Sequence, residues 1–274
     1  MIGDVKAVIL CGGQGTRLRD PGGVLGAGAS SELLPKPLLP IGGRPAVWHI
    51  IRMLAHQGIK RFILCLGYKS WLFKDYFLNY QFIIQDVSVN LETGAVATLP
   101  RTASDLAGVE VTLAETGETT MTGGRIVKIR PYVENDPCFL VTYGDALADV
   151  DVAKLLEAHR RGGRVATLTG VRRPGRFGEL SIAADRVTEF AEKPQTGEGY
   201  VNGGFIVMDG RRIWDYIDPS PTTVLERAPL ERLAATDQLS LYCHDGFWQC
   251  MDTANEYEAL VSTWAQGRAP WKIW

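Results

Sequence analysis

Short apolar runs alternate with polar, glycine-bearing turns over the first two-thirds of the chain. Four of these runs have the length and bulk of strands that are buried on both faces. They span Ala7–Leu10, Phe62–Leu66, Phe139–Tyr143 and Val165–Val171. Apolar residues with helical spacing lie between them, at residues 46–57, 70–77 and 152–161. Strands that alternate with helices predict an α/β fold, a Rossmann-like and mostly parallel sheet with helices on both faces.

The pattern changes after residue 171. Two short alternating segments, Leu180–Ile182 and Val187–Phe190, predict antiparallel strands, and further strands are expected at Gly203–Met208 and Leu239–Cys243. We therefore expect a smaller antiparallel part beside the parallel sheet.

Local signals predict where several helices begin and end. Ser70 is a candidate N-cap, and Thr253 with Glu256 has the spacing of a capping box before the last helix. Pro131 should stop or kink the helix that begins near the polar loop Thr116–Arg125, and Pro229 should interrupt a helix over residues 222–235.

Composition narrows the class of protein. The 274 residues carry a net charge of −2, which gives no global electrostatic footprint for nucleic acid. No apolar run is long enough for a membrane span, and the first strand begins too early to leave room for a signal peptide. The five cysteines are scattered and lack paired spacing, which predicts reduced thiols in a cytoplasmic protein rather than disulfides or a zinc site.

A glycine-rich turn follows the first apolar run directly. From Leu10 to Arg17 the chain reads Leu-Cys-Gly-Gly-Gln-Gly-Thr-Arg. Glycines let the backbone come close to a ligand, and N–H groups in such turns can face phosphate oxygens. Arg17 adds a planar fork of donors that suits phosphate. We interpret the turn as a cradle for nucleotide phosphates; a tight turn with only a structural role is the alternative.

Two common phosphate-binding motifs do not fit this turn. A Walker A loop needs Lys followed by Ser or Thr after its last glycine, and these residues are missing. A dinucleotide-binding turn that started at Gly13 would need glycine where Leu18 stands. The spacing therefore disfavours both a P-loop and a nicotinamide-binding turn.

Two aspartates stand at positions that suit a metal ion. Asp145 follows an apolar run directly after Gly144, and Asp252 precedes the last helix. Mg²⁺ usually takes one or two protein carboxylates. The alternatives are a turn residue for Asp145 and a helix cap for Asp252. Because open α/β sheets bind ligands beyond the carboxyl ends of their strands, the turns at Gly12 and Gly144 can meet over one ligand.

Two lysines and the four histidines complete the candidate chemistry. Lys36 lies between two prolines, which stiffen the chain around it, and Lys193 lies in a Glu-Lys-Pro turn. Each lysine can face a phosphate or simply be solvated. The histidines show no metal-ligand spacing and are assigned no catalytic role.

Motifs along almost the whole chain resemble the sugar-phosphate nucleotidylyltransferases. The turn Gly12–Leu18 resembles the signature of the whole superfamily, and the proline-rich stretch Pro35–Pro45 follows it as in that family. Three further stretches resemble the cytidylyltransferase branch: Met121–Arg125, Thr142–Asp145 and Gly246–Thr253.

The resemblance implies one nucleotidyltransferase domain over residues 1–274, with residues 1–171 mainly binding the nucleotide and residues 172–274 mainly forming the sugar-binding and C-terminal helical part. It implies transfer of a cytidylyl group from CTP to α-D-glucose 1-phosphate, which gives CDP-glucose and pyrophosphate. Mg²⁺ is the implied cofactor. The implied partners are the two small-molecule substrates and further copies of the same chain, with no nucleic acid and no membrane.

The resemblance also implies a role for each matching residue. Asp145 and Asp252 are the implied metal ligands, and Arg17, Lys36 and Asp145 the implied catalytic residues. The implied nucleotide-binding residues are Leu10, Cys11, Gly12, Gly13, Gln14, Gly15, Thr16, Arg17, Lys36, Thr120, Arg125 and Gly144. The implied substrate-binding residues on the sugar side are Glu192, Lys193, Asn202 and Gly203.

The expected chemistry is an in-line attack of the sugar phosphate oxygen on the α-phosphorus of the nucleotide, in which the protein aligns two anions and neutralises charge. Because a glycine turn binds phosphates and not bases, dTTP, UTP or another hexose 1-phosphate remain alternatives. A non-catalytic nucleotide-sugar sensor with the same fold is the alternative from another class.

Overall fold

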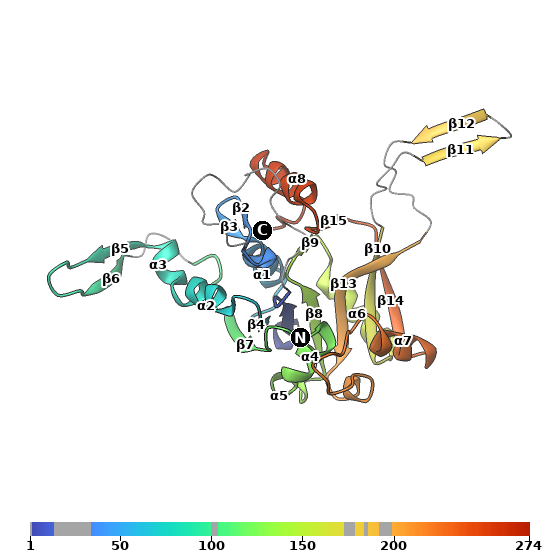
Figure 1. Ribbon diagram of the computed structural model, residues 1–274, viewed down its shortest axis with the longest axis horizontal. Helices are drawn as coiled ribbons and strands as arrows, with labels where there is room; N and C mark the ends of the chain where they lie inside the picture. The colour runs from blue at the N-terminus through green and yellow to red at the C-terminus, as the bar shows by residue number, and fades with distance from the viewer. Residues whose placement is uncertain (1, 14–33, 100–103, 173–178, 184–185, 192–198) are drawn as a thin grey trace.

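A seven-stranded mixed sheet forms the centre of the protein, in a computed structural model that describes residues 2–13, 34–99, 104–172, 179–183, 186–191 and 199–274 (Figure 1). The strand order is β14-β10-β13-β8-β1-β4-β7. All pairings are parallel except those of β13, which runs antiparallel to both of its neighbours. The strands are β1 (Lys6–Leu10), β4 (Arg61–Leu66), β7 (Glu110–Glu115), β8 (Cys138–Tyr143), β10 (Ala166–Val171), β13 (Val201–Asp209) and β14 (Leu239–His244).

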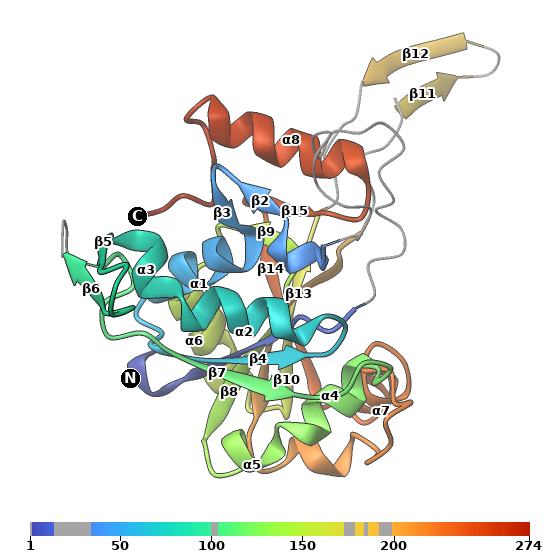
Figure 2. The same cartoon turned by 60° about the vertical axis from the view of Figure 1, so that its left-hand side comes forward.

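Helices cover both faces of this sheet, as Figure 2 shows. Alternate residues of β1 divide between the two cores: Ala7 and Ile9 pack on one side, Val8 and Leu10 on the other. The first core includes α1 (Ala46–His56), α2 (Ser70–Leu78), α6 (Val152–Gly162) and α8 (Ala254–Ala265). The second includes α4 (Thr122–Lys128), α5 (Arg130–Val133) and α7 (Ala228–Ala235). The predicted α/β fold with helices on both faces is confirmed.

Smaller elements surround the sheet. Four two-stranded pairs are β2 (Pro40–Ile41) with β3 (Arg44–Pro45), β5 (Asp86–Val89) with β6 (Val96–Leu99), β9 (Ala146–Ala148) with β15 (Trp248–Cys250), and β11 (Glu179–Ala183) with β12 (Arg186–Ala191). The remaining helices are α3 (Tyr80–Ile84) and the 3₁₀ turns η1 (Ile2–Asp4), η2 (Lys36–Leu38) and η3 (Ile213–Asp215). The antiparallel pair predicted near residues 180–190 is confirmed as β11 and β12.

The structure tests the predicted helix signals one by one. The capping box of Thr253 and Glu256 is confirmed, and Pro131 lies in the first turn of α5, which is separated from α4 at Ile129. The Ser70 prediction is wrong because Lys69, in the left-handed region with φ 51°, is the N-cap and Ser70 is already helical. The Pro229 prediction is also wrong. This proline stands in the first turn of α7, where its missing N–H is not needed, so it begins a helix instead of interrupting one.

Aromatic residues near the C-terminus pack onto the start of α1. Trp271 is fully buried, and its ring stacks on Trp264. His49 donates a hydrogen bond from Nε2 to the carbonyl of Ile41 (2.8 Å) and accepts one at Nδ1 from the Trp271 indole (3.4 Å). The C-terminal segment therefore supports the β2–β3 hairpin that follows η2. Among the helices of the described residues, none combines the length and the apolar character that a membrane span needs.

Candidate active site

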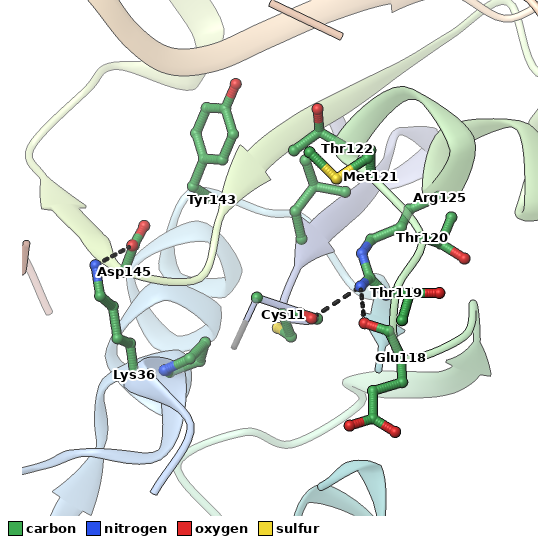
Figure 3. Close-up of a pocket in the computed structure, with 14 residues that line it drawn as sticks. Cys11, Lys36, Glu118, Thr119, Thr120, Met121, Thr122, Arg125, Tyr143 and Asp145 are labelled. Atoms are coloured by element: carbon green, nitrogen blue, oxygen red, sulfur yellow. Dashed lines mark hydrogen bonds and ion pairs between the residues drawn. The ribbon is translucent and has the colours of Figure 1, made fainter. Parts of the chain in front are cut away.

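A cavity of about 520 Å³ opens at the carboxyl ends of β1 and β8. Figure 3 shows Lys36 and Asp145 on one side of it, Arg125 and Glu118 on the other, and Cys11 between them. Residues from β1, η2, the loop before α4, α4 itself and the end of β8 line it: Leu10, Cys11, Gly12, Gly13, Lys36, Pro37, Glu118, Thr119, Thr120, Met121, Thr122, Arg125, Tyr143 and Asp145. The two turns that follow β1 and β8 thus meet over one cavity, as predicted.

Two glycines allow the close packing of the cavity wall. The N–H of Gly144 donates to the carbonyl of Leu10 (3.0 Å), and a Cβ on Gly144 would lie 2.6 Å from the Pro37 ring. A Cβ on Gly12 would lie 2.0 Å from the guanidinium carbon of Arg125. A Cβ on Gly13 would meet nothing within 4 Å. Gly12 is therefore needed for contact with Arg125, whereas Gly13 has open space around it.

Arg125 closes one end of the cavity through bonds to the protein itself. Its Nη1 donates to the carbonyl of Leu66 (2.9 Å) and to the hydroxyl of Thr116 (2.6 Å). Its Nη2 donates to the carbonyls of Gly12 (2.8 Å) and Glu118 (3.3 Å). The side chain is buried, and burial lowers the pKa of the guanidinium from its usual value, although an arginine stays charged in proteins. Arg125 thereby ties the ends of β1 and β4 to the loop before α4.

Lys36 and two carboxylates form the opposite end. The Lys36 ammonium lies 2.8 Å from Asp252 Oδ1 and 3.4 Å from Asp145 Oδ2. The β9–β15 ladder, with Cys250 opposite Ala146, and a bond from the Met251 N–H to the carbonyl of Asp145 (2.9 Å) bring the two aspartates together. Burial raises the pKa of Asp145, which Lys36 opposes and Asp252 reinforces. Burial acts to lower the pKa of Lys36, but the hydrogen bond that Lys36 donates to Asp252 and the charge of Asp145 outweigh it and raise that pKa.

This carboxylate pair fits a divalent cation. Two carboxylates from distant parts of the chain converge on one positive nitrogen, so the site already favours positive charge at that point. Carboxylate oxygens are the ligands that Mg²⁺ prefers. Cys250 adds a sulfur 3.7 Å from Asp252 Oδ2, and the Glu256 carboxylate lies close to Cys250 and Asp252. The Glu256 carboxylate accepts the N–H groups of Asp252 and Thr253, which makes it a helix cap in this structure.

Cys11 lies on the cavity floor between the two ends. Burial, first of all, raises the pKa of its thiol well above the usual value, and the nearby Cys65 and Asp145 add to this. A thiol that stays protonated is a poor nucleophile. The floor of the cavity therefore offers no activated cysteine for covalent catalysis.

A wall of the cavity depends on Glu226, which the sequence analysis did not identify. The Tyr143 hydroxyl donates to one oxygen of this carboxylate, and the Thr122 hydroxyl donates to the other (2.6 Å). Thr122 also accepts the N–H of Leu225 (2.9 Å). Burial, then the charge of Glu226, raises the pKa of Tyr143 and keeps its hydroxyl protonated as a donor. Tyr143 stood at a predicted strand end and could have been selected, but nothing local to Glu226 marks its partners.

The predicted site residues fall into three groups. Those that line the cavity are Leu10, Cys11, Gly12, Gly13, Lys36, Thr120, Arg125 and Asp145, with Gly144 packed directly behind and Asp252 joined through Lys36. Asn202 and Gly203 lie outside the cavity lining: the Asn202 side chain accepts the N–H of Gly204 (2.9 Å), and the Gly203 carbonyl accepts the indole N–H of Trp248 (2.8 Å). Gln14, Gly15, Thr16, Arg17, Glu192 and Lys193, together with residues 19–33, lie outside the described residues.

Comparison with known proteins identifies the family. Residues 6–214 match the family described as nucleotidyl transferase. A glucose-1-phosphate cytidylyltransferase of Salmonella typhimurium is 42% identical over 98% of this chain and 100% of its own length. A mannose-1-phosphate guanylyltransferase of Mycobacterium tuberculosis is 30% identical over 97% of this chain and 66% of its own. The crystal structure of HddC from Yersinia pseudotuberculosis shares the fold, with a TM-score of 0.64, 24% identity and coverage of 95% of this chain and 99% of that one. The chain belongs to the nucleotidyl transferase family.

Proposed function

We propose that this chain transfers a cytidylyl group from CTP to α-D-glucose 1-phosphate and releases CDP-glucose and pyrophosphate. The observation that carries the chemistry is the convergence of Lys36, Asp145 and Asp252 at the open cavity beyond β1 and β8. The choice of CTP and glucose 1-phosphate rests on the Salmonella relative, which this chain matches over its whole length.

The residues of the cavity suit a displacement between two anions. The sugar phosphate oxygen attacks the α-phosphorus in line, a new P–O bond forms, and the bond to pyrophosphate breaks. Lys36 and Arg17 would stabilise charge on the α-phosphate and the leaving group. Lys193 would hold the incoming sugar phosphate, with Glu192, Asn202 and Gly203 on the same side. Asp145 and Asp252 would hold Mg²⁺, which supplies charge neutralisation and a template for phosphate oxygens when bound.

The broader assignments are proposals of the same kind. We propose one domain over residues 1–274, which the presence of β13 and β14 in the same sheet as β1 supports. The five free cysteines agree with a cytoplasmic protein. Its proposed small-molecule partners are CTP and the sugar 1-phosphate. We also propose that the chain associates with further copies of itself. The guanylyltransferase relative shows that other bases occur among relatives of this chain, so dTTP or UTP, or another hexose 1-phosphate, is the second candidate.

A pyrophosphate-release assay tests the proposal. The chain is mixed with Mg²⁺, glucose 1-phosphate and, in separate reactions, CTP, dTTP, UTP or ATP. We expect release with CTP well above the others. A preference for another nucleotide would keep the chemistry and overturn the base, and binding of nucleotide without release from any sugar 1-phosphate would favour a sensor. Omission of Mg²⁺ should abolish release.

A further inference from the structure

A second cavity lies at the amino-terminal ends of β1 and β8, away from the candidate active site. Its volume is about 450 Å³, close to the 520 Å³ of the active-site cavity and within the usual range for small-molecule sites. Because β1 begins beside one cavity and ends at the other, its five residues place the two about 16 Å apart. The charged residues of its lining are Asp4, Arg160, Arg164, Asp209 and Arg212. The proposed reaction uses none of them.

The arginines of this lining come from separate parts of the chain. Arg160 lies in the last turn of α6 and Arg164 follows the end of that helix, whereas Arg212 follows β13. Positive charge is favoured at the C-terminus of a helix, which accounts for Arg160. It does not account for Arg212, which reaches the same cavity from a turn after a strand. The cluster is therefore more than the charge complement of one helix.

The three guanidinium groups differ in what already binds them. Arg164 is paired with Asp237, whose Oδ1 accepts from its Nε and Nη2 (3.1 and 2.9 Å). Arg212 donates to two uncharged groups, a backbone carbonyl (3.3 Å) and the Gln238 side chain (2.7 Å). In the described part of the chain, Arg160 has no hydrogen-bond or ion-pair partner. Arg160 and Arg212 therefore keep donors and positive charge that an anionic ligand can use.

The charged groups converge on one buried imidazole. His159 lines the cavity and pairs through Nδ1 with the Thr167 hydroxyl (3.0 Å). Burial is the main cause that lowers the pKa of His159; the charge of Asp209 opposes it, and the charges of Arg160 and Arg212 add to it. All three charged side chains thus lie within electrostatic reach of the same ring, so a small ligand can contact them together.

A carboxylate on this lining suits hydroxyl groups. Asp209 Oδ1 accepts the backbone N–H groups of Arg211 and Arg212 (both 2.9 Å), which leaves Oδ2 to accept from a ligand. Among the described residues, the lining contains no Phe, Tyr or Trp on which a nucleobase would stack. The lining therefore favours a phosphate with a hydroxylated carbon skeleton over a nucleotide.

We infer that this second cavity binds a small phosphate ester that carries hydroxyl groups, the chemistry of a sugar phosphate. The planar forks of Arg160 and Arg212 hold the phosphate oxygens, and Asp209 accepts from a hydroxyl. Because the two cavities lie at opposite ends of β1, this ligand and the substrates of the proposed reaction can be bound at the same time. The inference does not depend on the proposed reaction.

Hydrogen exchange with ribose 5-phosphate as the probe tests the inference, without Mg²⁺ or CTP. Amides of residues 159–165 and 209–213 in the wild-type chain should become more protected as the probe concentration rises. Ribose should protect neither segment, and inorganic phosphate should protect both less than the ester does. Protection that is absent or confined to the active-site cavity overturns the inference, as does equal protection by ribose. Equal protection by inorganic phosphate overturns the assignment of an ester.

Two matched double variants locate the binding site. Arg160→Gln with Arg212→Gln should weaken binding of the probe at least about tenfold, because hydrogen bonds between charged partners are lost. The control, Arg161→Gln with Arg211→Gln, removes the same charge at exposed neighbours outside the lining and should bind like the wild type. Equal weakening by both double variants would indicate a general attraction of anions and overturn the inference.

A single variant guards against a loss of folding. Arg160→Gln removes no hydrogen bond or ion pair to the described residues, so it should weaken binding of ribose 5-phosphate while the thermal unfolding midpoint stays unchanged. Wild-type affinity in this variant would overturn the role of Arg160. Because protection is read without turnover, a chain that binds the probe but releases no pyrophosphate would count against the proposed chemistry alone.

Discussion

Two positively charged side chains, those of Arg125 and Lys36, lie at opposite ends of the cavity, and the protein holds them through different kinds of contact. Arg125 is buried and donates to three backbone carbonyls and one hydroxyl, all of which belong to the cavity wall. Lys36 is held by two carboxylates, which carry charges of their own and can bind another cation. Carbonyls shape the cavity, whereas carboxylates can exchange partners during a reaction. We propose that the Arg125 end provides architecture and the Lys36 end provides chemistry.

Removal of a carboxylate from the Lys36 end should have the largest effect on turnover. We expect Asp145→Ala to lose at least about a hundredfold in turnover, since loss of one electrostatic partner typically costs about 2.7–4 kcal/mol of barrier. Asp252→Ala and Arg17→Ala should lose similar amounts. Pyrophosphate release gives the rate, and circular dichroism checks the fold. Asp215→Ala, on an exposed residue of η3, is the control and should keep normal turnover. Near-normal turnover of a folded Asp145→Ala enzyme would contradict the metal role.

Removal of the Arg125 side chain, at the other end of the cavity, should instead lower the stability of the fold. Arg125→Met keeps much of the side-chain volume but takes its donor away from the buried carbonyl of Gly12, whereas the carbonyl of Leu66 still accepts the N–H and the hydroxyl of Thr116. We expect the free energy of unfolding to fall by about 1–3 kcal/mol, the cost of one buried carbonyl that is left unsatisfied. Urea denaturation measures it, and Arg160→Met on an exposed arginine of α6 is the control. If Arg125→Met unfolds like the wild type but loses turnover, the division between the two ends is wrong.

Local sequence patterns predicted the strand ends that border the cavity. The strand ends at β1 and β8 follow from apolar runs that stop at glycine, so Gly12, Gly144 and Asp145 could be located from the sequence. Local patterns could not pair these residues with Arg125, Lys36 and Asp252, which come from distant parts of the chain and which the family resemblance assigned to the same site. Arg125 lies 113 residues from the Gly12 carbonyl, and Asp252 lies 216 residues from Lys36. A pattern within a window of residues carries no information about such pairs.

A helix boundary was predicted correctly where a few adjacent residues determine it. It was predicted wrongly where contacts with other parts of the folded chain determine it. The capping box at Thr253 needs only two residues three positions apart, and it is present. Pro229 is compatible with either the interruption or the first turn of a helix, and the contacts of α7 decide between them. Glu226, just before α7, is hidden for the same reason: its function depends on Tyr143 and Thr122, which approach it only in the folded chain.

Acid should lower the stability of the protein through His49, which holds the β2 strand that follows Lys36 and η2. Burial, with Arg44 adding to it and the hydrogen bond to the Ile41 carbonyl opposing it, lowers the pKa of His49 from 6.5 to about 4. The folded chain therefore holds a neutral imidazole, which accepts at Nδ1 from Trp271 and donates to the β2 carbonyl of Ile41. Between these two pKa values the unfolded chain binds a proton that the folded chain does not. Stability is therefore lost as pH falls below 6.5, by about 2 kcal/mol at about pH 5. Denaturation of wild type and His49→Gln across pH isolates this loss; equal pH dependence of the two would contradict it.

The smallest effect is expected at Glu226, on the wall between the two ends. Glu226→Gln can accept from only one of the two hydroxyls that donate to the carboxylate, so either Tyr143 or Thr122 loses its acceptor and faces an NH2 donor instead. The expected cost is about 1.5 kcal/mol, roughly a tenfold loss in kcat/KM for the nucleotide. Since Glu226 acts through Tyr143 and Thr122, the loss should appear in KM for the nucleotide more than in kcat. Glu231→Gln, on an exposed residue of α7, is the matched control and should leave both constants unchanged. A fall in kcat alone would place Glu226 with the Lys36 chemistry, and no change in either constant would leave it a structural contact between the chain before α7 and the residues Tyr143 and Thr122.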